Sequence, residues 1–127
     1  MAVVETKRIR NVALLGHGGC GKTSLSEALL YITGATDRIG KVADGNTVSD
    51  YDAEEVKRGF SISASLMNTT WKDTKINVLD TPGYLDFVGE VAQSLRVADA
   101  AIIVVDGKAG IEVGTELAWG YAEEAGL

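Results

Sequence analysis

An eight-residue glycine-rich run constrains this chain more than any other feature. Residues 16–23 read G-H-G-G-C-G-K-T and fit the pattern G-x-x-x-x-G-K-T. In such a loop, successive backbone N–H groups point inward and surround nucleotide phosphates, and the glycines bring the backbone close to the anion. Lys22 would supply charge to the β- and γ-phosphates, and the Thr23 hydroxyl would ligate Mg²⁺. A tight turn between a strand and a helix could also have this sequence. The residues before and after the run therefore have to distinguish a phosphate loop from such a turn.

The flanks favour the phosphate loop. Residues 10–15 are predicted to form a short buried strand, and Gly34 suits the end of a helix. Between the loop and Gly34, apolar residues recur at helical spacing, at Leu25, Ala28, Leu29 and Ile32. The helix would direct its positive N-terminal end at the phosphates. We therefore expect nucleotide contacts from His17, Gly18, Gly19, Cys20, Gly21, Lys22, Thr23 and Ser24.

The middle of the chain predicts a hairpin after a long loop. Residues 34–59 have little apolar periodicity, and a loop of that length in a compact domain is usually functional or disordered. Residues 61–71 alternate, which predicts a half-buried strand with Ile62, Ala64 and Leu66 on its inner face. Residues 72–74 would form a turn, and residues 75–79 the second strand.

The last third of the chain predicts a helix, a strand and a helix. Residues 100–105 are continuously apolar, as in a parallel strand that is covered on both faces. The helices on either side are marked by Val88, Val91 and Leu95, and by Val113, Leu117 and Tyr121. The predicted fold is an α/β P-loop NTPase, a mostly parallel sheet with one antiparallel hairpin strand and flanking helices.

Composition narrows the functional classes. At 127 residues the chain is at most one small domain, and its net charge of −6 without a basic patch argues against direct nucleic-acid binding. The densest charge, in residues 50–58, is expected to be a solvated face. A single cysteine excludes an internal disulfide and fits a reducing cytosol. No signal peptide and no apolar run of about 20 residues is present, so we expect a cytoplasmic protein without a membrane span.

A second motif follows the hairpin. Residues 80–83 read D-T-P-G directly after a predicted strand. In an open α/β sheet the ligand lies beyond the carboxyl ends of the strands, where this motif and the phosphate loop would meet. Asp80 could hold Mg²⁺, commonly through water, and Gly83 could offer a backbone N–H to the γ-phosphate. An ordinary turn stabilised by Pro82 would carry the same letters.

Together these motifs resemble the N-terminal GTPase domain of bacterial elongation factor G. The resemblance rests on G-H-x-x-x-G-K-T, on R-G-F-S-I at residues 58–62, and on D-T-P-G-Y-L-D-F at residues 80–87 with Glu90. Similar domains occur in tetracycline-resistance ribosomal protection proteins and in paralogues of elongation factor G. The resemblance implies a first switch at residues 34–61 and a second at residues 80–90, both ordered by γ-phosphate and Mg²⁺.

Two residues depart from the family pattern. Ser61 stands where the family usually has threonine, but it keeps the hydroxyl, so the resemblance implies a metal site of Thr23, Ser61 and Asp80. Tyr84 stands where the family has the histidine that positions the attacking water. A phenol cannot readily replace an imidazole in that role, although it can still hydrogen-bond a water. Tyr84 would either position water poorly or cover the site, and residue 84 itself would lie beyond the contacts that Asp80 and Gly83 make.

The resemblance implies a GTPase that binds GTP or GDP with Mg²⁺ and acts on the ribosome. Its catalytic residues would be Lys22, Gly83 and Tyr84. The alternatives are a nucleotide-dependent ribosome-binding switch or protection factor with little hydrolysis, and, less favoured by the motifs, another P-loop ATPase. The family's guanine-recognition motif N-K-x-D is absent from these 127 residues, so we expect a partial GTPase domain whose sheet is incomplete on its C-terminal side. Its strand at residues 100–105 would then be an edge that invites self-association.

Overall fold

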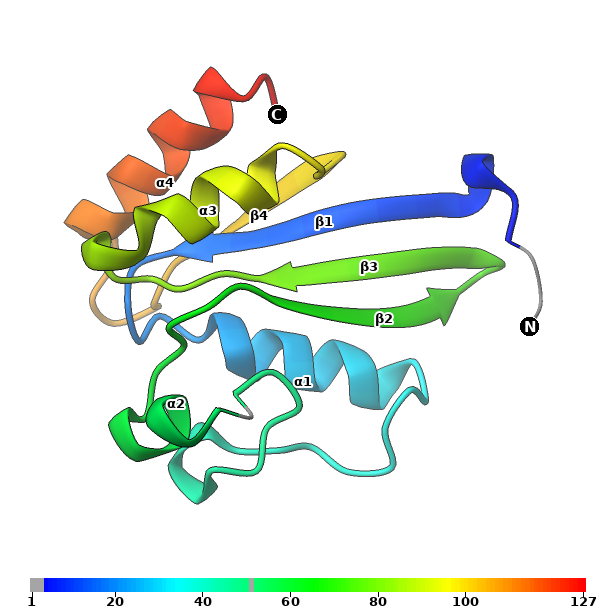
Figure 1. The fold of residues 1–127 in the computed structure, drawn as a ribbon, viewed down its shortest axis with the longest axis horizontal. Coiled ribbons are helices and arrows are strands. Elements are labelled where there is room, and N and C mark those ends of the chain that lie inside the picture. The colour runs from blue at the N-terminus through cyan, green and yellow to red at the C-terminus, as the bar shows by residue number, and fades with distance from the viewer. Residues whose placement is uncertain (1–3, 51) are drawn as a thin grey trace.

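The computed structural model describes residues 4–50 and 52–127. Within these ranges, four strands form one sheet in the order β2-β3-β1-β4 (Figure 1). The strands are β1 (Ile9–Gly16), β2 (Ser65–Trp71), β3 (Thr74–Asp80) and β4 (Ala100–Val104). β1 runs parallel to β3 and β4, and β2 runs antiparallel to β3. The predicted α/β class, with one antiparallel hairpin strand, is confirmed.

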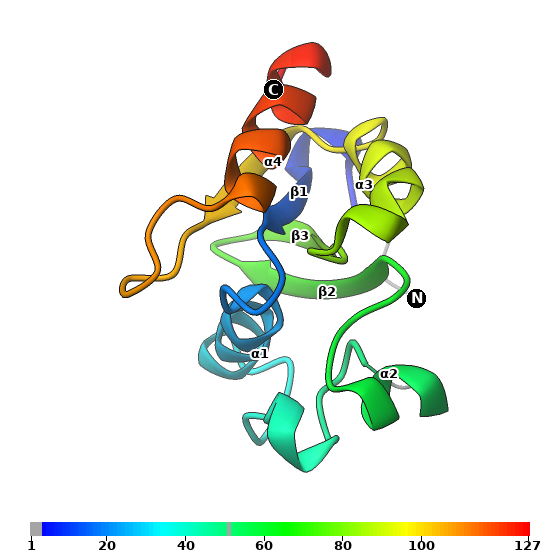
Figure 2. The ribbon, with the colours of Figure 1, turned by 90° about the vertical axis from the view of Figure 1, so that its left-hand side faces the viewer.

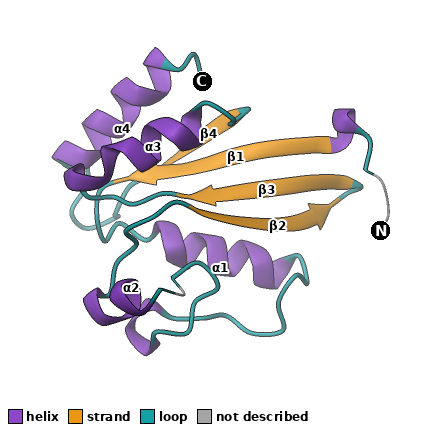
Figure 3. Cartoon of the chain, in the orientation of Figure 1, coloured by secondary structure: helices purple, strands orange, loops and turns teal. Residues whose placement is uncertain are grey.

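The helices cover the sheet from both sides. They are α1 (Lys22–Ile32), α2 (Ala53–Arg58), α3 (Val88–Leu95) and α4 (Val113–Glu124), with 3₁₀ turns at Thr6–Arg8, Val42–Asp44 and Leu85–Phe87. α1 lies on one face of the sheet, and α3 and α4 lie on the other (Figure 2). α2 and the loops around it lie on the same side as α1 (Figure 3). None of the helices in the described ranges is long and apolar enough to cross a membrane.

β1 is the centre of both hydrophobic cores. Leu14 packs toward α1, in a cluster with Leu30, Met67 and Val78. Its neighbours in the strand face α3 and α4, in a cluster that comprises Ala13, Leu15, Leu79, Val91, Leu95, Ala118 and Ala122. A strand with helices on both faces needs a continuous apolar run, which A-L-L supplies. This packing fixes the carboxyl end of β1, where the phosphate loop begins.

The hairpin is confirmed, but the predicted phase of its first strand is wrong. β2 begins only at Ser65, and its alternation is reversed, because Ser65 and Met67 are buried while Leu66 is 65% exposed. The Ser65 hydroxyl is satisfied in the interior by donating to the Ser49 carbonyl at 2.8 Å. A hydroxyl with a buried acceptor is tolerated inside, so the apolar letters alone gave the wrong face.

Three further expectations are corrected. β4 is covered on one face rather than two, and Ile102 on its other face is 43% exposed. α1 turns Leu30 inward and leaves Ile32 70% exposed. The segment 34–59 is not wholly irregular, because α2 forms within it, capped by Asp52, whose side chain accepts from the Glu54 N–H.

Candidate functional site

The phosphate loop connects the end of β1 to the start of α1. Gly19 and Gly21 take φ values of 80° and 102°, a left-handed conformation that favours glycine. Lys22 begins α1 and is 6% exposed, and its ammonium donates to the carbonyls of Gly16 at 3.1 Å and His17 at 2.8 Å. The charged end of Lys22 is thus fixed beside the loop, where the side chain lines a cavity of about 230 Å³.

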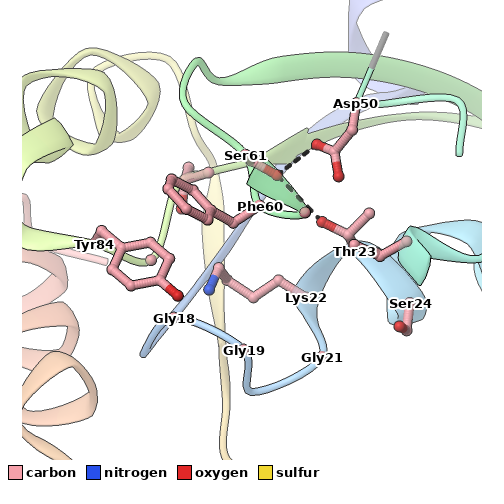
Figure 4. Close-up of a pocket in the computed structure, with 14 residues that line it drawn as sticks. Gly18, Gly19, Gly21, Lys22, Thr23, Ser24, Asp50, Phe60, Ser61 and Tyr84 are labelled. Atoms are coloured by element: carbon pink, nitrogen blue, oxygen red, sulfur yellow. Dashed lines mark hydrogen bonds between the residues drawn. The ribbon is translucent and has the colours of Figure 1, made fainter. Parts of the chain in front are cut away.

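That cavity joins three segments that lie far apart in sequence (Figure 4). The phosphate loop lines it with Gly18, Gly19, Gly21, Lys22, Thr23 and Ser24. The segment predicted as the first switch adds Val42, Asp50, Gly59, Phe60 and Ser61, and the second adds Thr81, Gly83 and Tyr84. The convergence follows from the sheet, because β1 and β3 are neighbours in register and end together, with Leu14 opposite Asp80. The Thr81 hydroxyl secures the join by donating to the Leu14 carbonyl at 2.6 Å.

The three predicted metal ligands lie together. The Thr23 hydroxyl donates to the Asp80 carboxylate at 2.7 Å, and its oxygen lies 3.4 Å from the Ser61 hydroxyl. The Ser61 hydroxyl in turn donates to the Asp50 carboxylate at 2.6 Å. Two hydroxyls and two carboxylates therefore form one polar cluster at the edge of the cavity, which includes Asp50, a residue that the motifs did not indicate.

This cluster fits a magnesium ion by its chemistry. One oxygen of each carboxylate, Asp50 Oδ2 and Asp80 Oδ1, is buried and has no hydrogen-bond partner among the described residues. Mg²⁺ prefers oxygen ligands and is usually held by one or two carboxylates together with phosphate oxygens. Within the described ranges no cluster of three or more His, Cys, Asp or Glu side chains is suited to a metal, so this carboxylate and hydroxyl set is the candidate.

Burial makes both carboxylates hold their protons more tightly. Burial raises the pKa of Asp80 to about 6, against the opposing effects of the Thr23 hydrogen bond and the Lys22 charge. The pKa of Asp50 is raised as well, mainly by burial and further by the charges of Glu55 and Glu27, while the Ser61 hydrogen bond lowers it. A bound cation would reverse this balance by stabilising both ionised forms.

The second motif approaches the phosphate loop closely. A Cβ added to Gly83 would clash with the Lys22 ammonium and would lie 2.6 Å from the Gly18 nitrogen. Only glycine allows this approach, which brings the backbone of residue 83 beside the loop, as a γ-phosphate contact requires. The N–H contact itself stays a prediction.

Tyr84 also reaches the cavity. Its side chain is 42% exposed, and its ring lies 4.5 Å from the Phe60 ring, between centroids, at an interplanar angle of 49°. The ring itself lines the phosphate cavity, whereas the expectation that residue 84 lies beyond the Asp80 and Gly83 contacts stays a prediction. Both roles left open by the sequence, water positioning and covering the site, stay predictions.

Two residues of the loop direct their side chains elsewhere. The His17 Nδ1 accepts from the Gly114 N–H at 3.2 Å, and its Nε2 lies 3.5 Å from a Glu112 carboxylate oxygen. Cys20 is 8% exposed, and its Sγ lies 3.8 Å from the Lys22 ammonium. Neither side chain lines the cavity. Nucleotide contacts from these two residues stay predictions that depend on their backbone.

Buried glutamates hold the segment predicted as the first switch, and the sequence did not indicate them. Glu27 is 1% exposed and accepts from the N–H groups of Gly40 at 2.7 Å and Val48 at 2.5 Å. Glu55 accepts from two more N–H groups, those of Ile62 at 3.0 Å and Ser63 at 3.1 Å. The predicted solvated face at residues 50–58 is thus wrong at Asp50 and Glu55, which are 4% and 3% exposed.

A further carboxylate ties the residues just before β2 to α3. Glu90 in α3 accepts from the Ala64 N–H at 2.8 Å, just before β2. The segment predicted as the first switch is therefore tied to α1 through Glu27, and Ala64, just beyond that segment, is tied to α3 through Glu90. Such contacts depend on packing between distant segments, and a single sequence offers no signal for them.

Comparison with known proteins agrees with this geometry. Residues 7–127 match the family of the elongation factor Tu GTP binding domain. The chain belongs to this family. It is 45% identical over 120 residues to mitochondrial ribosome-releasing factor 2 of Anopheles gambiae, and 42% identical over 123 residues to elongation factor G of Granulibacter bethesdensis. These matches cover 94% and 97% of the chain but only 16% and 18% of the two relatives.

Solved structures match the chain over a similar share of its length. A crystal structure of a Thermus thermophilus protein matches with a TM-score of 0.91 and 47% identity, over 94% of this chain and 18% of that one. A bacterial selenocysteine-specific elongation factor matches with a TM-score of 0.70 and 27% identity, over 90% and 17%. The resemblance to elongation factor G and the P-loop GTPase fold are therefore both confirmed. The chain spans less than a fifth of the length of each of these proteins.

Proposed function

We propose that this domain binds GTP or GDP with Mg²⁺ and hydrolyses GTP as part of a factor that acts on the ribosome. The observation that carries the proposal is the convergence of the two switch segments on the phosphate loop through Thr23, Ser61, Asp50 and Asp80. A GTPase switch needs such a meeting point, because γ-phosphate and Mg²⁺ order the two segments and hydrolysis releases them. The names of the relatives support the ribosome as the partner.

Each part of the site has a role in this proposal. Lys22 places its charge beneath the cavity, where it would neutralise charge that develops on the phosphates. Thr23, Ser61 and Asp80, with Asp50, would hold Mg²⁺, which when bound neutralises phosphate charge. Gly83 brings backbone to the phosphate end, and the helix N-terminus of α1 favours the anion there.

A second candidate is a nucleotide-dependent ribosome-binding switch or protection factor that hydrolyses GTP slowly. The observation that favours it is Tyr84, which lines the cavity at the position where the family carries a water-positioning histidine. A phenol with an unperturbed pKa near ~10 is a poor general base at neutral pH. The third reading, a P-loop ATPase of another lineage, is disfavoured by the family match.

Calorimetric titration of the chain with GTP, GDP and ATP in the presence of Mg²⁺ tests the proposal. We expect binding that Lys22→Ala abolishes, while the matched variant Lys72→Ala, in the exposed turn between β2 and β3, binds normally. Binding that survives Lys22→Ala would contradict the phosphate-loop site. Hydrolysis should then be measured with ribosomes in the polypeptide that the complete gene encodes. Rapid stimulated hydrolysis favours the first candidate, and tight GTP-dependent ribosome binding with slow hydrolysis favours the second.

A further inference from the structure

Gly18 differs from the other glycines of the phosphate loop in why it must be glycine. Gly16, Gly19 and Gly21 all have φ values in the region that disfavours side chains, whereas Gly18 does not. A Cβ added to Gly18 would nevertheless lie 2.8 Å, 2.9 Å and 3.0 Å from three ring atoms of Tyr84. These are its three nearest neighbours, and the first two distances are shorter than real Cβ contacts. The backbone at residue 18 would accept alanine, but the new methyl group would have to displace the Tyr84 ring.

A second contact holds the Tyr84 ring in this position, although 42% of the residue is exposed to solvent. On its other side it packs against the Phe60 ring of the first switch segment, with centroids 4.5 Å apart. The preceding residue, Gly83, is itself pressed against the backbone of Gly18. The ring is therefore wedged between the phosphate loop and the first switch, and Figure 4 shows its hydroxyl directed toward the Lys22 ammonium.

We propose that Gly18 and Tyr84 are a matched pair that closes the phosphate cavity: the missing side chain at residue 18 makes room for a phenol ring, which with Phe60 forms an aromatic lid over bound nucleotide phosphates. The proposal rests on the proposed function, since the retained ligand is a guanine nucleotide. It assigns Tyr84 a positioning role that does not depend on proton transfer. The lid joins both switch segments to the loop, so opening it requires the Tyr84 and Phe60 rings to separate.

The pair predicts how nucleotide release responds to substitution. Tyr84→Ala removes the lid and should speed the release of nucleotide by roughly 3- to 10-fold, the range that an aromatic pair is worth. Gly18→Ala should speed release by a similar factor, because the new methyl group displaces the ring. The two changes act on the same contact, so the double variant should release nucleotide no faster than Tyr84→Ala alone. Tyr84→Phe keeps the ring, so this variant should release nucleotide as slowly as wild type.

Release of a fluorescent guanosine triphosphate analogue into excess unlabelled GTP, followed by stopped flow, tests this cycle. Gly19→Ala is the matched control, since its φ of 80° strains any side chain while nothing lies within 4 Å of the added Cβ. Gly19→Ala should change the rate of nucleotide release by the same factor in the wild-type background and in the Tyr84→Ala background. Circular dichroism of each variant checks that it is folded.

The outcomes separate the pair from the proposed function. Effects of Gly18→Ala and Tyr84→Ala that multiply in the double variant would overturn the pair, as would fast release in Tyr84→Phe. Either result would leave the phosphate-loop site intact if Lys22→Ala still abolishes binding. A wild-type chain that retains no nucleotide would overturn both proposals. If Gly18→Ala fails to fold, the ratio of release rates for Tyr84→Ala and Tyr84→Phe still decides whether the ring forms the lid.

Discussion

The Thr23 hydroxyl donates a 2.7 Å hydrogen bond to the Asp80 carboxylate and so joins the first turn of α1 to the end of β3. The two residues are 57 positions apart in the chain, and the parallel pairing of β1 with β3 brings them together. Asp80 is 1% exposed, so its charge has little solvent to stabilise it. The contact therefore places a poorly solvated carboxylate beside a hydroxyl, an arrangement that suits a cation better than an empty site.

Asp80→Asn should have opposite effects with and without Mg²⁺. The pKa of Asp80 is raised from 3.8 to about 6, so without metal the folded chain binds the proton more tightly than the unfolded chain. The free energy of unfolding should then fall as the pH rises from about 4 to 6, by up to about 3 kcal/mol. Asn carries no charge, so the variant should lack this fall and be the more stable form at pH 7. Chemical denaturation across this pH range in EDTA measures it.

In the presence of Mg²⁺ and GTP, wild type should instead be the better-stabilised protein, because it binds the metal and the nucleotide more tightly than Asp80→Asn does. Loss of the carboxylate should weaken Mg²⁺-dependent nucleotide binding by at least 10-fold, the scale seen when a supporting group of a metal site is removed. Asp86→Asn, which neutralises an exposed carboxylate shortly after the D-T-P-G motif, is the matched control. It should change neither the free energy of unfolding nor the Mg²⁺-dependent nucleotide affinity. Equal nucleotide affinity of Asp80→Asn and wild type at limiting Mg²⁺ would show that Asp80 does not serve the metal.

How far the sequence predicted this site depended on whether a residue works through local backbone or through distant packing. The G-K-T loop and D-T-P-G were predictable, because local backbone geometry requires their glycines and because each motif follows a strand. Asp50 was not, because its role arises from the Ser61 hydroxyl, which reaches it across a fold that no periodicity encodes. Asp50 lies in a charged run, and a run of charges is ordinarily solvated.

The same distinction explains the errors in the fold. The serine-rich start of the hairpin alternates evenly, and the letters favoured burying Leu66. Instead Ser65 enters the interior because the Ser49 carbonyl lies there to accept its hydrogen bond, and Ser49 belongs to a loop without regular pattern. For the turn between β2 and β3, the sequence predicted the position of the turn but not its backbone conformation. Lys72 and Asp73 take φ values of 45° and 60°, although neither is glycine.

Glu27→Gln should loosen the first switch segment. Both carboxylate oxygens of Glu27 accept backbone N–H groups, from Gly40 and Val48, and a glutamine amide can accept only one of them. The other N–H loses its acceptor in a buried place, which should cost about 1 to 3 kcal/mol. Amide hydrogen exchange should accelerate at Gly40 or Val48, and the free energy of unfolding should fall. Glu116→Gln, at an exposed glutamate of α4, should leave both unchanged.

The 127-residue chain should self-associate through β4. In the described sheet β4 pairs only with β1, and its outward-facing Ile102 is 43% exposed. Trp119 of α4, which is 60% exposed, adds apolar surface. An unpaired strand edge of this kind is a template for further pairing. Sedimentation velocity over a range of concentrations should show association that Ile102→Lys reduces, and a monomer at high concentration would rule the prediction out.

Tyr84→His should raise ribosome-stimulated GTP hydrolysis in the polypeptide that the complete gene encodes. An imidazole can orient and polarise the attacking water near neutral pH, whereas a phenol mostly cannot. Groups of this kind typically contribute about 10²- to 10⁴-fold, so even partial recovery should be visible.

Single-turnover hydrolysis with ribosomes measures the change, and nucleotide release must be measured alongside it, because the Tyr84 ring lines the cavity. Tyr31→His is the matched control, since it makes the same substitution at a tyrosine near the end of α1 that is 47% exposed and does not line the cavity. A rise in hydrolysis with unchanged release would assign the gain to water positioning. If wild type is already fast and Tyr84→His slows it, the tyrosine is itself the adapted catalytic group, and the slow-switch candidate fails.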